Sequence, residues 1–366
     1  MISGRGGGTA GNSPQSMVQD DCAEVVEHGL VSAIEDLQGE TILVTGGTGF
    51  MGTWIAEMCS YLNDQLSFNI KLILLSENAR SFAERVPHLA SRPDIILLEQ
   101  EISTVVELPA DVGFLIHAAA TPDNRVHSSQ PLKTIRAIVN GTDAVMSAAA
   151  FLPNLKKILH ISSGLVYGAQ QPGVTRISEK SHGIASEPGA ITSVYSESKR
   201  MAETVCTAHR NQHRLQIVTA RPFAFIGPYQ RLDRPWAINN FIRDGLMGGP
   251  IRILGDTRTV RSYMYPSDMA WWILQILVHG TSGLSYNVGS PHPISLAELA
   301  EQIAANFSVT PRIVAASARG QDASERIVSR FVPDVTLSRS SLGLELCVDL
   351  DTAIKRTIRW NQSFVA

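Results

Sequence analysis

The sequence predicts an α/β protein with a doubly wound parallel sheet and a smaller, mixed α/β substrate domain in its C-terminal part. From residue 40 onward, short apolar runs alternate with segments of helical length, which is typical of parallel strands buried on both faces. A glycine-rich turn, "TGGTGFMG", directly follows the first run and opens a helical segment. After Arg221 the alternation gives way to shorter elements rich in Gly and Pro, which indicates the smaller domain.

The elements follow in a regular order. The apolar runs "TILV", "IKLILL", "DIILL", "GFLIHA", "KKILHIS" and "LQIVTA" predict strands. Helices are expected over residues 50–62, 131–150 and 194–209, where the spacing and length suit them. Ahead of the sheet, residues 1 to about 17 are Gly/Ser-rich and predict disorder, and apolar spacing predicts an added helix over residues 20–37.

The domain boundaries predicted from this pattern are interleaved. An N-terminal extension covers residues 1–38. Residues 39–222, together with about 265–290, form the nucleotide-binding domain, and residues 223–264 plus 291–366 form the substrate domain.

Composition narrows the class of partner. The chain has 366 residues, 44% hydrophobic and 18% charged, with a formal net charge of -3. Such a chain can bury a large core, and it has no overall basic field to hold nucleic acid or an anionic membrane, so a small-molecule partner is expected. Its four cysteines lie far apart, so no metal site is predicted. No signal-like apolar region or spanning segment is visible, so a cytoplasmic protein is expected.

The glycine-rich turn predicts a nucleotide cofactor. Gly46, Gly49 and Gly52 stand between a strand and a helix. Side chains there would block a pyrophosphate, whose charge the helix N-terminus attracts. A purely structural tight turn is the alternative, and the strand-to-helix context favours cofactor binding.

The spacing G-x-x-G-x-x-G resembles that of the extended short-chain dehydrogenase/reductase superfamily, in its branch of nucleotide-sugar epimerases and dehydratases. Further matches follow in order along about residues 40–360: "HAAA", "NGT", "SSGLVYG", "YSESK", "RPFAFIGP", "RSYMYPSDM" and "YNVGS". The resemblance implies a Rossmann fold that binds NAD, with NADP as the alternative. By resemblance, the cofactor contacts are Gly46, Gly49, Phe50, Met51, Gly52, Ser76, Glu77, Arg80, Glu101, Ile102, Ala118, Ala119, Asn140, Tyr195 and Lys199.

The choice between NAD and NADP depends on the end of the second strand. NAD-selecting members of the family usually carry an acid where this chain has Ser76. Ser76 and Glu77 suit the ribose of NAD, whereas Arg80 suits the extra phosphate of NADP, and a solvated surface charge is an equal reading of Arg80. By resemblance, Glu101 and Ile102 lie at the adenine.

Tyr195 and Lys199 are the predicted acid/base pair. They are one helical turn apart and share a face. A tyrosine has a reference pKa of about 10, and a nearby ammonium group favours its phenolate. The resemblance implies that this pair acts on a sugar hydroxyl during nicotinamide hydride transfer, and that Ser163 binds the reacting oxygen while Ser162 is structural.

The positions after Ser163 limit the reaction. Family dehydratases carry Asp and Glu there, and decarboxylases carry Glu at the second position, but this chain has Gly164 and Leu165. Neither residue titrates, so we expect a 4-epimerase, with a 4-keto-sugar reductase as the alternative. Dehydration is a minor alternative in which Glu179 or Glu187 of the long loop over residues 168–192 supplies the acid; a solvated lid is the preferred reading of that loop.

The substrate side is expected to bind a nucleotide-diphosphate sugar. By resemblance, its contacts are Asn240, Phe241, Arg261 and Arg330, with both guanidinium groups on the diphosphate or, alternatively, in surface ion pairs. Ala224 replaces the family's asparagine and weakens the substrate assignment.

Two larger alternatives concern the protein as a whole. A homodimer is expected from the resemblance through residues 131–150 and 194–209, unless the small side chains of residues 147–150 pack within one monomer. A non-catalytic cofactor sensor is the alternative of another class, but a sensor has no need of Ser163, Tyr195 and Lys199.

Overall fold

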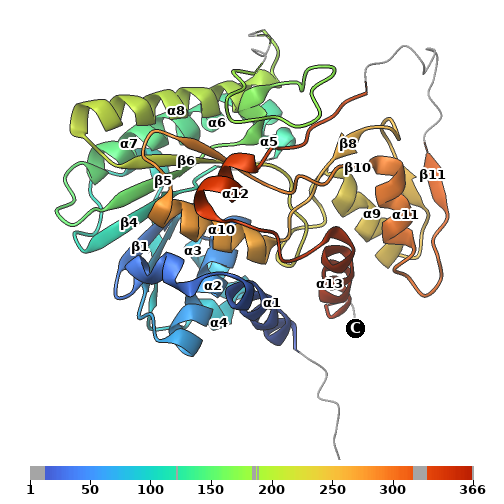
Figure 1. Ribbon diagram of the computed structural model, residues 1–366, viewed down its shortest axis with the longest axis horizontal. Coiled ribbons are helices and arrows are strands. Elements are labelled where there is room, and N and C mark those ends of the chain that lie inside the picture. Colours follow the sequence, from blue (N-terminus) through green and yellow to red (C-terminus); the bar gives the residue numbers. More distant parts are fainter. Residues whose placement is uncertain (1–12, 121–122, 184–186, 188, 316–327, 365–366) are drawn as a thin grey trace, which may run out of the picture.

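A seven-stranded parallel sheet forms the centre of the computed structural model (Figure 1). The structure describes residues 13–120, 123–183, 187, 189–315 and 328–364. All neighbouring strands of this sheet run parallel, and the order reverses between β1 and β4, which are paired. In spatial order the strands are β3 (Ile95–Glu99), β2 (Lys71–Ser76), β1 (Thr41–Thr45), β4 (Val112–His117), β5 (Lys157–Ile161), β6 (Ile217–Pro222) and β9 (Ser285–Val288).

Alternate residues of each central strand enter two separate cores. In β1, Ile42 and Val44 belong to one core cluster and Leu43 to the other; in β2, Leu72 and Leu74 join the first and Ile73 the second. Because both faces are covered, the strands are continuous apolar runs. The predicted Rossmann-type doubly wound sheet is confirmed.

Helices cover the two faces in two groups (Figure 1). On the face of the larger core lie α1 (Pro14–His28), the 3-10 helix η1 (Val31–Leu37), α2 (Phe50–Leu66), α3 (Ala79–Arg85), α4 (Pro87–Ala90) and α10 (Pro266–His279). The opposite face carries η2 (Ile102–Thr104), α7 (Gly141–Ala149) and α8 (Ser193–His213). Towards α8 the chain also forms α5 (Asn124–Ser129), α6 (Pro131–Ile135) and the π-helical turn η3 (Arg136–Asn140).

A smaller group of elements lies to one side of the sheet (Figure 1). Two short strand pairs support it, one parallel between β7 (Ile251–Ile253) and β11 (Ile313–Ala315), the other antiparallel between β8 (Val260–Arg261) and β10 (Ile294–Ser295). Its helices include α9 (Ala237–Leu246), α11 (Leu296–Ala304) and α13 (Leu350–Gln362). The 3-10 helix η4 (Gly164–Tyr167) follows β5, and α12 (Thr336–Leu342) contacts β9 and α10.

Two expected helices differ from those observed. The N-terminal helix begins at Pro14, earlier than expected, and residues 1–12 lie outside the described part. It ends at His28, because Gly29 adopts an extended conformation as the C-cap, and a separate 3-10 helix follows. The Trp271 ring would lie 2.4 Å from a Cβ at Gly29, so only glycine fits this position. The expected helix over residues 131–150 is divided into α6 and α7 by the π-helical turn.

Candidate functional site

The glycine-rich turn forms a tight cradle between β1 and α2. Gly46 has a φ of 65°, and a Cβ there would lie 2.8 Å from the Ala118 carbonyl oxygen. A Cβ on Gly52 would lie 2.2 Å from the Gly47 carbonyl oxygen, so the turn closes only with glycine at these positions. Gly49 is the exposed N-cap of α2. The first amides of this 17-residue helix therefore remain available to an anion, and the cradle fits a dinucleotide pyrophosphate.

The predicted adenosine contacts surround the ends of β2 and β3. The Thr48 hydroxyl donates to Ser76 Oγ at 2.7 Å, and Asn78 N donates to the same oxygen at 3.2 Å. Glu77 and Arg80 are both exposed beside it. Glu101 Oε2 accepts a hydrogen bond from Ser103, at 2.6 Å. Ile102 is buried.

The other predicted cofactor contacts differ in burial and in hydrogen bonding. Phe50 and Met51 are half-buried in the first turn of α2. Ala118 and Ala119 follow β4, and their amides lie 3.2 and 3.3 Å from Thr45 Oγ1. Asn140 is exposed at the end of the π-helical turn, so its cofactor contact remains a prediction.

The predicted catalytic residues come together between β5 and α8. Tyr195 and Lys199 lie in the first two turns of α8, and both are buried. The Tyr195 hydroxyl hydrogen-bonds the hydroxyl of Ser163, the second residue after the end of β5. The Lys199 ammonium donates to the Ile161 carbonyl oxygen at 2.7 Å. Two elements distant in sequence thus place two hydroxyls and one amine at the carboxyl end of the sheet.

Burial dominates the titration of this pair. It raises the pKa of Tyr195 to about 12, against the opposing effect of the hydrogen bond with Ser163. It lowers the pKa of Lys199 to about 8, because the ammonium form is the one that loses solvation. At neutral pH the Tyr195 phenol is therefore uncharged, whereas the Lys199 amine is still mostly protonated, with a pKa much closer to neutrality than that of an exposed lysine.

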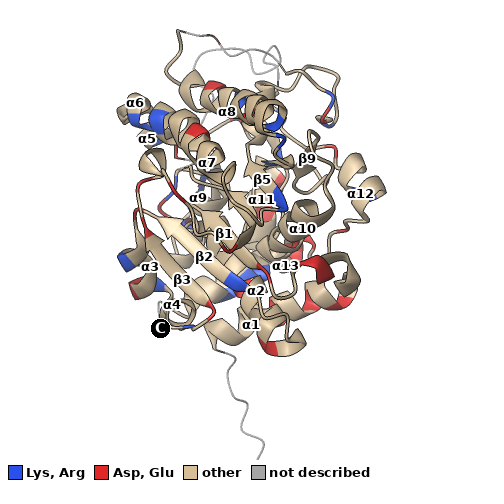
Figure 2. Cartoon of the chain, turned by 90° about the vertical axis from the view of Figure 1, so that its left-hand side faces the viewer, with Lys and Arg blue, Asp and Glu red and all other residues tan. Residues whose placement is uncertain are grey.

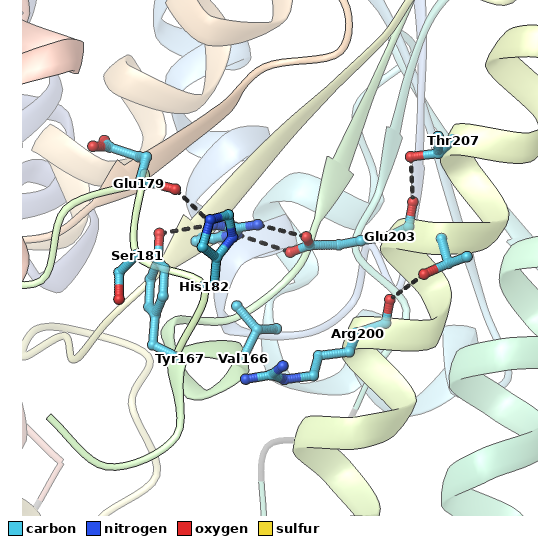
Figure 3. Close-up of a pocket in the computed structure, with 10 residues that line it drawn as sticks. Val166, Tyr167, Glu179, Ser181, His182, Arg200, Glu203 and Thr207 are labelled. Atoms are coloured by element: carbon cyan, nitrogen blue, oxygen red, sulfur yellow. Dashed lines mark hydrogen bonds and ion pairs between the residues drawn. The ribbon is translucent and has the colours of Figure 1, made fainter. Parts of the chain in front are cut away.

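Ser162, in contrast to Ser163, belongs to a separate hydrogen-bond network. Its hydroxyl donates to Glu203 Oε1 at 2.5 Å, and the same carboxylate pairs with Arg221 at 2.7 Å. Arg221 also donates to the Tyr167 hydroxyl oxygen at 2.9 Å. Figure 3 shows these groups around a cavity of about 380 Å³.

The structure shows what surrounds Gly164 and Leu165, the two positions that lack acids. A Cβ on Gly164 would lie 2.9 Å from the Phe223 ring, which therefore occupies the space of a side chain at 164. The Phe223 ring in turn contacts Phe331, with ring centroids 4.8 Å apart. Leu165 is 44% exposed and leaves an apolar surface two residues after Ser163.

The predicted substrate arginines lie on neighbouring segments of the chain. Arg330 forms a parallel bridge with Val260, the residue that precedes Arg261 in β8. Arg261 Nη1 donates to the Val260 carbonyl oxygen at 2.8 Å, and Arg330 Nε donates to the Thr175 carbonyl oxygen at 2.8 Å. Neither bond uses a carboxylate, so both groups retain positive charge for an anion.

The other two predicted substrate contacts lie on α9 and differ in exposure. Asn240 Oδ1 accepts a hydrogen bond from Arg243 at 2.8 Å. Phe241 is buried in the core, which leaves its backbone as the part available to a ligand.

Three residues near the site were not identified from the sequence. Gly47 approaches Leu74 closely, with 2.9 Å between the Leu74 Cα and a Cβ at Gly47, and its place beside Gly46 in "TGGTG" was a usable signal. Phe223 and His127 contact Gly164 and Tyr195 across long sequence separations. No local pattern indicates such contacts.

Membrane and metal sites were also sought in the described residues. None of their helices has the length and apolar character to cross a bilayer. No group of three or more His, Cys, Asp or Glu side chains suited to a metal ion occurs within the same part of the chain. Basic and acidic positions are interspersed along the helices that face the viewer in Figure 2.

The glycine cradle, the reversal of strand order and the Ser, Tyr and Lys cluster define a nucleotide-dependent oxidoreductase-type fold. The sequence profile of the NAD dependent epimerase/dehydratase family matches residues 42–289, and the chain belongs to this family. It is therefore an NAD-dependent enzyme of the extended short-chain dehydrogenase/reductase type.

Individual relatives are similar to the chain over most of its length. The chain is 28% identical to UDP-glucuronic acid decarboxylase 6 of Arabidopsis thaliana over 311 residues, covering 84% of this chain and 85% of the relative. It is 25% identical to UDP-glucuronic acid decarboxylase 1 of Xenopus tropicalis over 331 residues, covering 90% and 74%.

Solved structures share the fold. A UDP-glucose 4-epimerase of Thermotoga maritima superposes with a TM-score of 0.72 at 19% identity, covering 89% of this chain and all of the other, 100%. A dTDP-glucose 4,6-dehydratase of Bacillus anthracis, in complex with NAD, superposes with a TM-score of 0.71 at 21% identity, covering 88% and 96%.

Proposed function

We propose that the protein acts on a nucleotide-diphosphate sugar as a 4-epimerase, inverting one carbinol carbon without eliminating a substituent. The family and the names of the relatives support a nucleotide-activated sugar. The Ser163, Tyr195 and Lys199 cluster supports chemistry at a hydroxyl group.

Each residue of the cluster has a distinct role in this proposal. The Ser163 hydroxyl holds the carbinol oxygen beside Tyr195, and Tyr195 Oη takes the proton of the sugar hydroxyl and later returns it. Lys199 is buried within the same helix and, when protonated, stabilises the phenolate. The glycine cradle and α2 N-terminus hold NAD, which supplies hydride acceptance and donation when bound.

One observation carries the proposal of a reaction without elimination. Dehydration and related eliminations need a protein acid or base that acts at the sugar carbons next to the reacting carbinol. The Phe223 ring fills the space at Gly164, and Leu165 presents hydrocarbon. Glu179, an alternative acid, accepts a hydrogen bond from Asn287 N at 2.9 Å, which favours a structural role.

Decarboxylation of a nucleotide-activated uronic acid is the second candidate. It is favoured by the relatives that are 25% and 28% identical over most of the chain. A ketone at C4 makes the carboxylate on C5 a β-keto acid, which can lose carbon dioxide without a general acid at position 165. Leu165 stands where we expect a glutamate in those enzymes, so decarboxylation by this chain would proceed without that residue, and product analysis decides between the two candidates.

The diphosphate of the substrate is assigned to the paired strands of the smaller domain. Arg261 lies in β8 and Arg330 is bridged to the preceding residue, Val260, and guanidinium groups suit phosphate oxygens. The backbone at Asn240 and Phe241 is the second proposed contact.

The proposed enzyme works as a homodimer through α6, α7 and α8. Leu132 and Ile135 of α6 and Met201 of α8 are 64%, 37% and 51% exposed, whereas Ala148 and Ala149 of α7 are buried in the core of the monomer. Burying the three exposed side chains against a second copy removes apolar surface from water. Light scattering of the purified protein tests this assignment, and a monomer at working concentration contradicts it.

The function is tested by product NMR in deuterated water with UDP-glucose, UDP-glucuronic acid and dTDP-glucose as substrates. An epimerase yields a C4 epimer of unchanged mass, leaves C5 unlabelled and needs no added reductant. Stoichiometric NADH or NADPH consumption with a 4-keto sugar identifies the reductase instead. A pentose product identifies the decarboxylase, and a product lighter by one water contradicts the reading of Gly164 and Leu165.

The control is Tyr195→Phe. It removes the proton-transfer group and is expected to lower turnover by about 100-fold or more while the fold remains intact. Near wild-type turnover in this variant places the acid and base elsewhere.

A further inference from the structure

His127 lies flat against the proposed acid/base. Its imidazole and the Tyr195 ring have centroids 4.4 Å apart and planes inclined by 12°. Both side chains are buried, at 4% and 6% exposure. His127 belongs to α5 and Tyr195 to α8, so the two rings meet between separate helices. Such a stack fixes the plane in which the phenol lies and keeps water from that face.

The helix that carries His127 is held at its N-terminus by Asp123. The Asp123 carboxylate accepts from Arg125 N at 3.0 Å as the N-cap, and His127 N donates to the Asp123 carbonyl oxygen at 3.1 Å. Although α5 has only 6 residues, this cap gives it a defined start.

Asp123 also reaches a different part of the molecule. Its carboxylate forms ion pairs with Arg125 and with Arg234, which lies between β6 and α9. Hydrogen bonds from Arg125, with the contribution of Arg234, hold the pKa of Asp123 well below its usual range. The carboxylate is therefore charged at neutral pH, and Arg234 connects the chain leading into the smaller domain to α5.

We infer that His127 is a positioning residue for Tyr195 and that the Arg234–Asp123 ion pair holds it in place. The inference rests on the proposed role of Tyr195. The imidazole acts on the phenol by packing, and the ion pair acts on the imidazole through α5. Arg234 lies in the segment between β6 and α9, which leads into the smaller group of elements. Through Asp123 and α5, this segment influences the orientation of the Tyr195 side chain.

The other neighbours of the Tyr195 side chain are of two kinds. Ser163 hydrogen-bonds its hydroxyl, and Lys199 lies one turn along the same helix. Ile138, Ala202 and Ala120 pack around it in an apolar cluster. The burial produced by His127 and these apolar side chains raises the pKa of Tyr195 to about 12. Opening one ring face to water is therefore expected to lower that pKa towards the ordinary value of about 10.

The first test measures Tyr195 directly and needs no substrate. Phenolate ultraviolet absorbance of the full chain is titrated between about pH 8 and pH 11, against the same protein carrying Tyr195→Phe. With His127 present, Tyr195 contributes little in this range. His127→Ala is expected to add the titration of one tyrosine, and His127→Phe, which preserves the flat contact, is expected to titrate as the unmodified chain does.

The second test separates positioning from general stability. With the nucleotide sugar that is turned over, His127→Ala is expected to lower kcat by about 10-fold or more with KM changed less than about 2-fold, and His127→Phe to restore most of kcat. Equal titration and equal kcat in the Ala and Phe variants overturn the inference. If Tyr195→Phe itself retains turnover, the proposed function fails. The absorbance titration still shows in that case whether the His127 ring shields Tyr195 from water.

The ion pair is tested with a matched variant in the same segment. Arg234→Gln is expected to shift the titration and kcat in the direction of His127→Ala, and to add nothing further in the His127→Ala background. Arg231→Gln is the control, because Arg231 pairs with Asp233 at 63% and 54% side-chain exposure. Additive effects of Arg234→Gln and His127→Ala, or equal effects of the two arginine variants, contradict the coupling.

Discussion

At the scale of single residues, the packing around Gly164 leaves no room for a carboxylate side chain at that position. The Phe223 ring occupies the space that a side chain at position 164 would need. Phe223 is in turn packed against Phe331 and lies 6.3 Å from Tyr167 between ring centroids. Restoring the acid would therefore require the aromatic ring to move.

This packing predicts a cost for Gly164→Asp. Because a Cβ lies 2.9 Å from the Phe223 ring, the variant is expected to lose about 1 to 3 kcal/mol of unfolding free energy in urea. Gly255→Asp is the matched control, since a Cβ there meets nothing within 4 Å. Phe223→Ala is expected to lower the free energy of unfolding by less in the Gly164→Asp variant than in the natural chain. Strictly additive losses of unfolding free energy contradict the assigned clash.

The residues of the site differ in how far a sequence reveals them. Helical periodicity places Tyr195 and Lys199 on one face, and the resemblance of "YSESK" and the motifs before it to the family is what singles the two residues out. Gly46 and Gly52 are predictable because their spacing serves the backbone of one turn. His127 and Phe223 were missed because their importance depends on contacts with Tyr195 and Gly164, which are 68 and 59 positions away. Tertiary packing creates such contacts, and no periodicity encodes them.

At the scale of elements, the added helix α1 is tied down by one buried carboxylate. Tyr265 Oη donates to Asp21 Oδ2 at 2.5 Å, and Arg356 Nη1 donates to Oδ1 at 2.7 Å. These partners belong to α10 and α13, so Asp21 joins three helices. Apolar spacing predicted a helix near this position, but the need for a glycine at its C-cap, Gly29, comes from Trp271, which is 242 residues further along the chain.

Asp21 predicts a pH dependence of stability. Burial raises its pKa from 3.8 to about 7, although the bonds from Tyr265 and Arg356 oppose the shift. The folded state thus binds the proton more tightly, and this contribution is full below about pH 4 and lost as the pH rises through about 7. The unfolding free energy of the natural chain, minus that of Asp21→Asn, is expected to fall by on the order of 1 to 4 kcal/mol across this range.

The measurement is urea unfolding at several pH values. Glu24→Gln is the control, because Glu24 pairs with the same Arg356 but its side chain is 30% exposed. The control is expected to show no comparable slope. A difference between the natural chain and Asp21→Asn that stays constant from pH 4 to pH 7 contradicts the assignment.

At the scale of the whole molecule, the two parts of the chain are interleaved. After β6 the chain enters the smaller group of elements, and it then returns with α10 and β9 to the main sheet. Trp360 of α13 contacts Tyr229, with ring centroids 4.8 Å apart, and Trp54 of α2 also contacts Tyr229 at 6.1 Å. Aromatic packing therefore continues from one part into the other.

This interleaving predicts one cooperative unfolding transition. Tryptophan fluorescence and far-ultraviolet circular dichroism are expected to give the same urea midpoint, because neither part can lose its structure while the other keeps its core. The domain division proposed from the sequence is thus a division of roles within one folding unit. Two separate transitions contradict this expectation.

The edge position of β9 also has a consequence for synthesis on the ribosome. β6 ends at Pro222 and its partner β9 begins at Ser285, so 63 residues of translation separate the two strands. At about 5 to 20 residues per second, the open edge of β6 waits for roughly 3 to 13 seconds before its hydrogen-bonding partner has been made. During that interval the nascent chain exposes an apolar strand edge to other nascent chains, and a chaperone that covers sheet edges protects it.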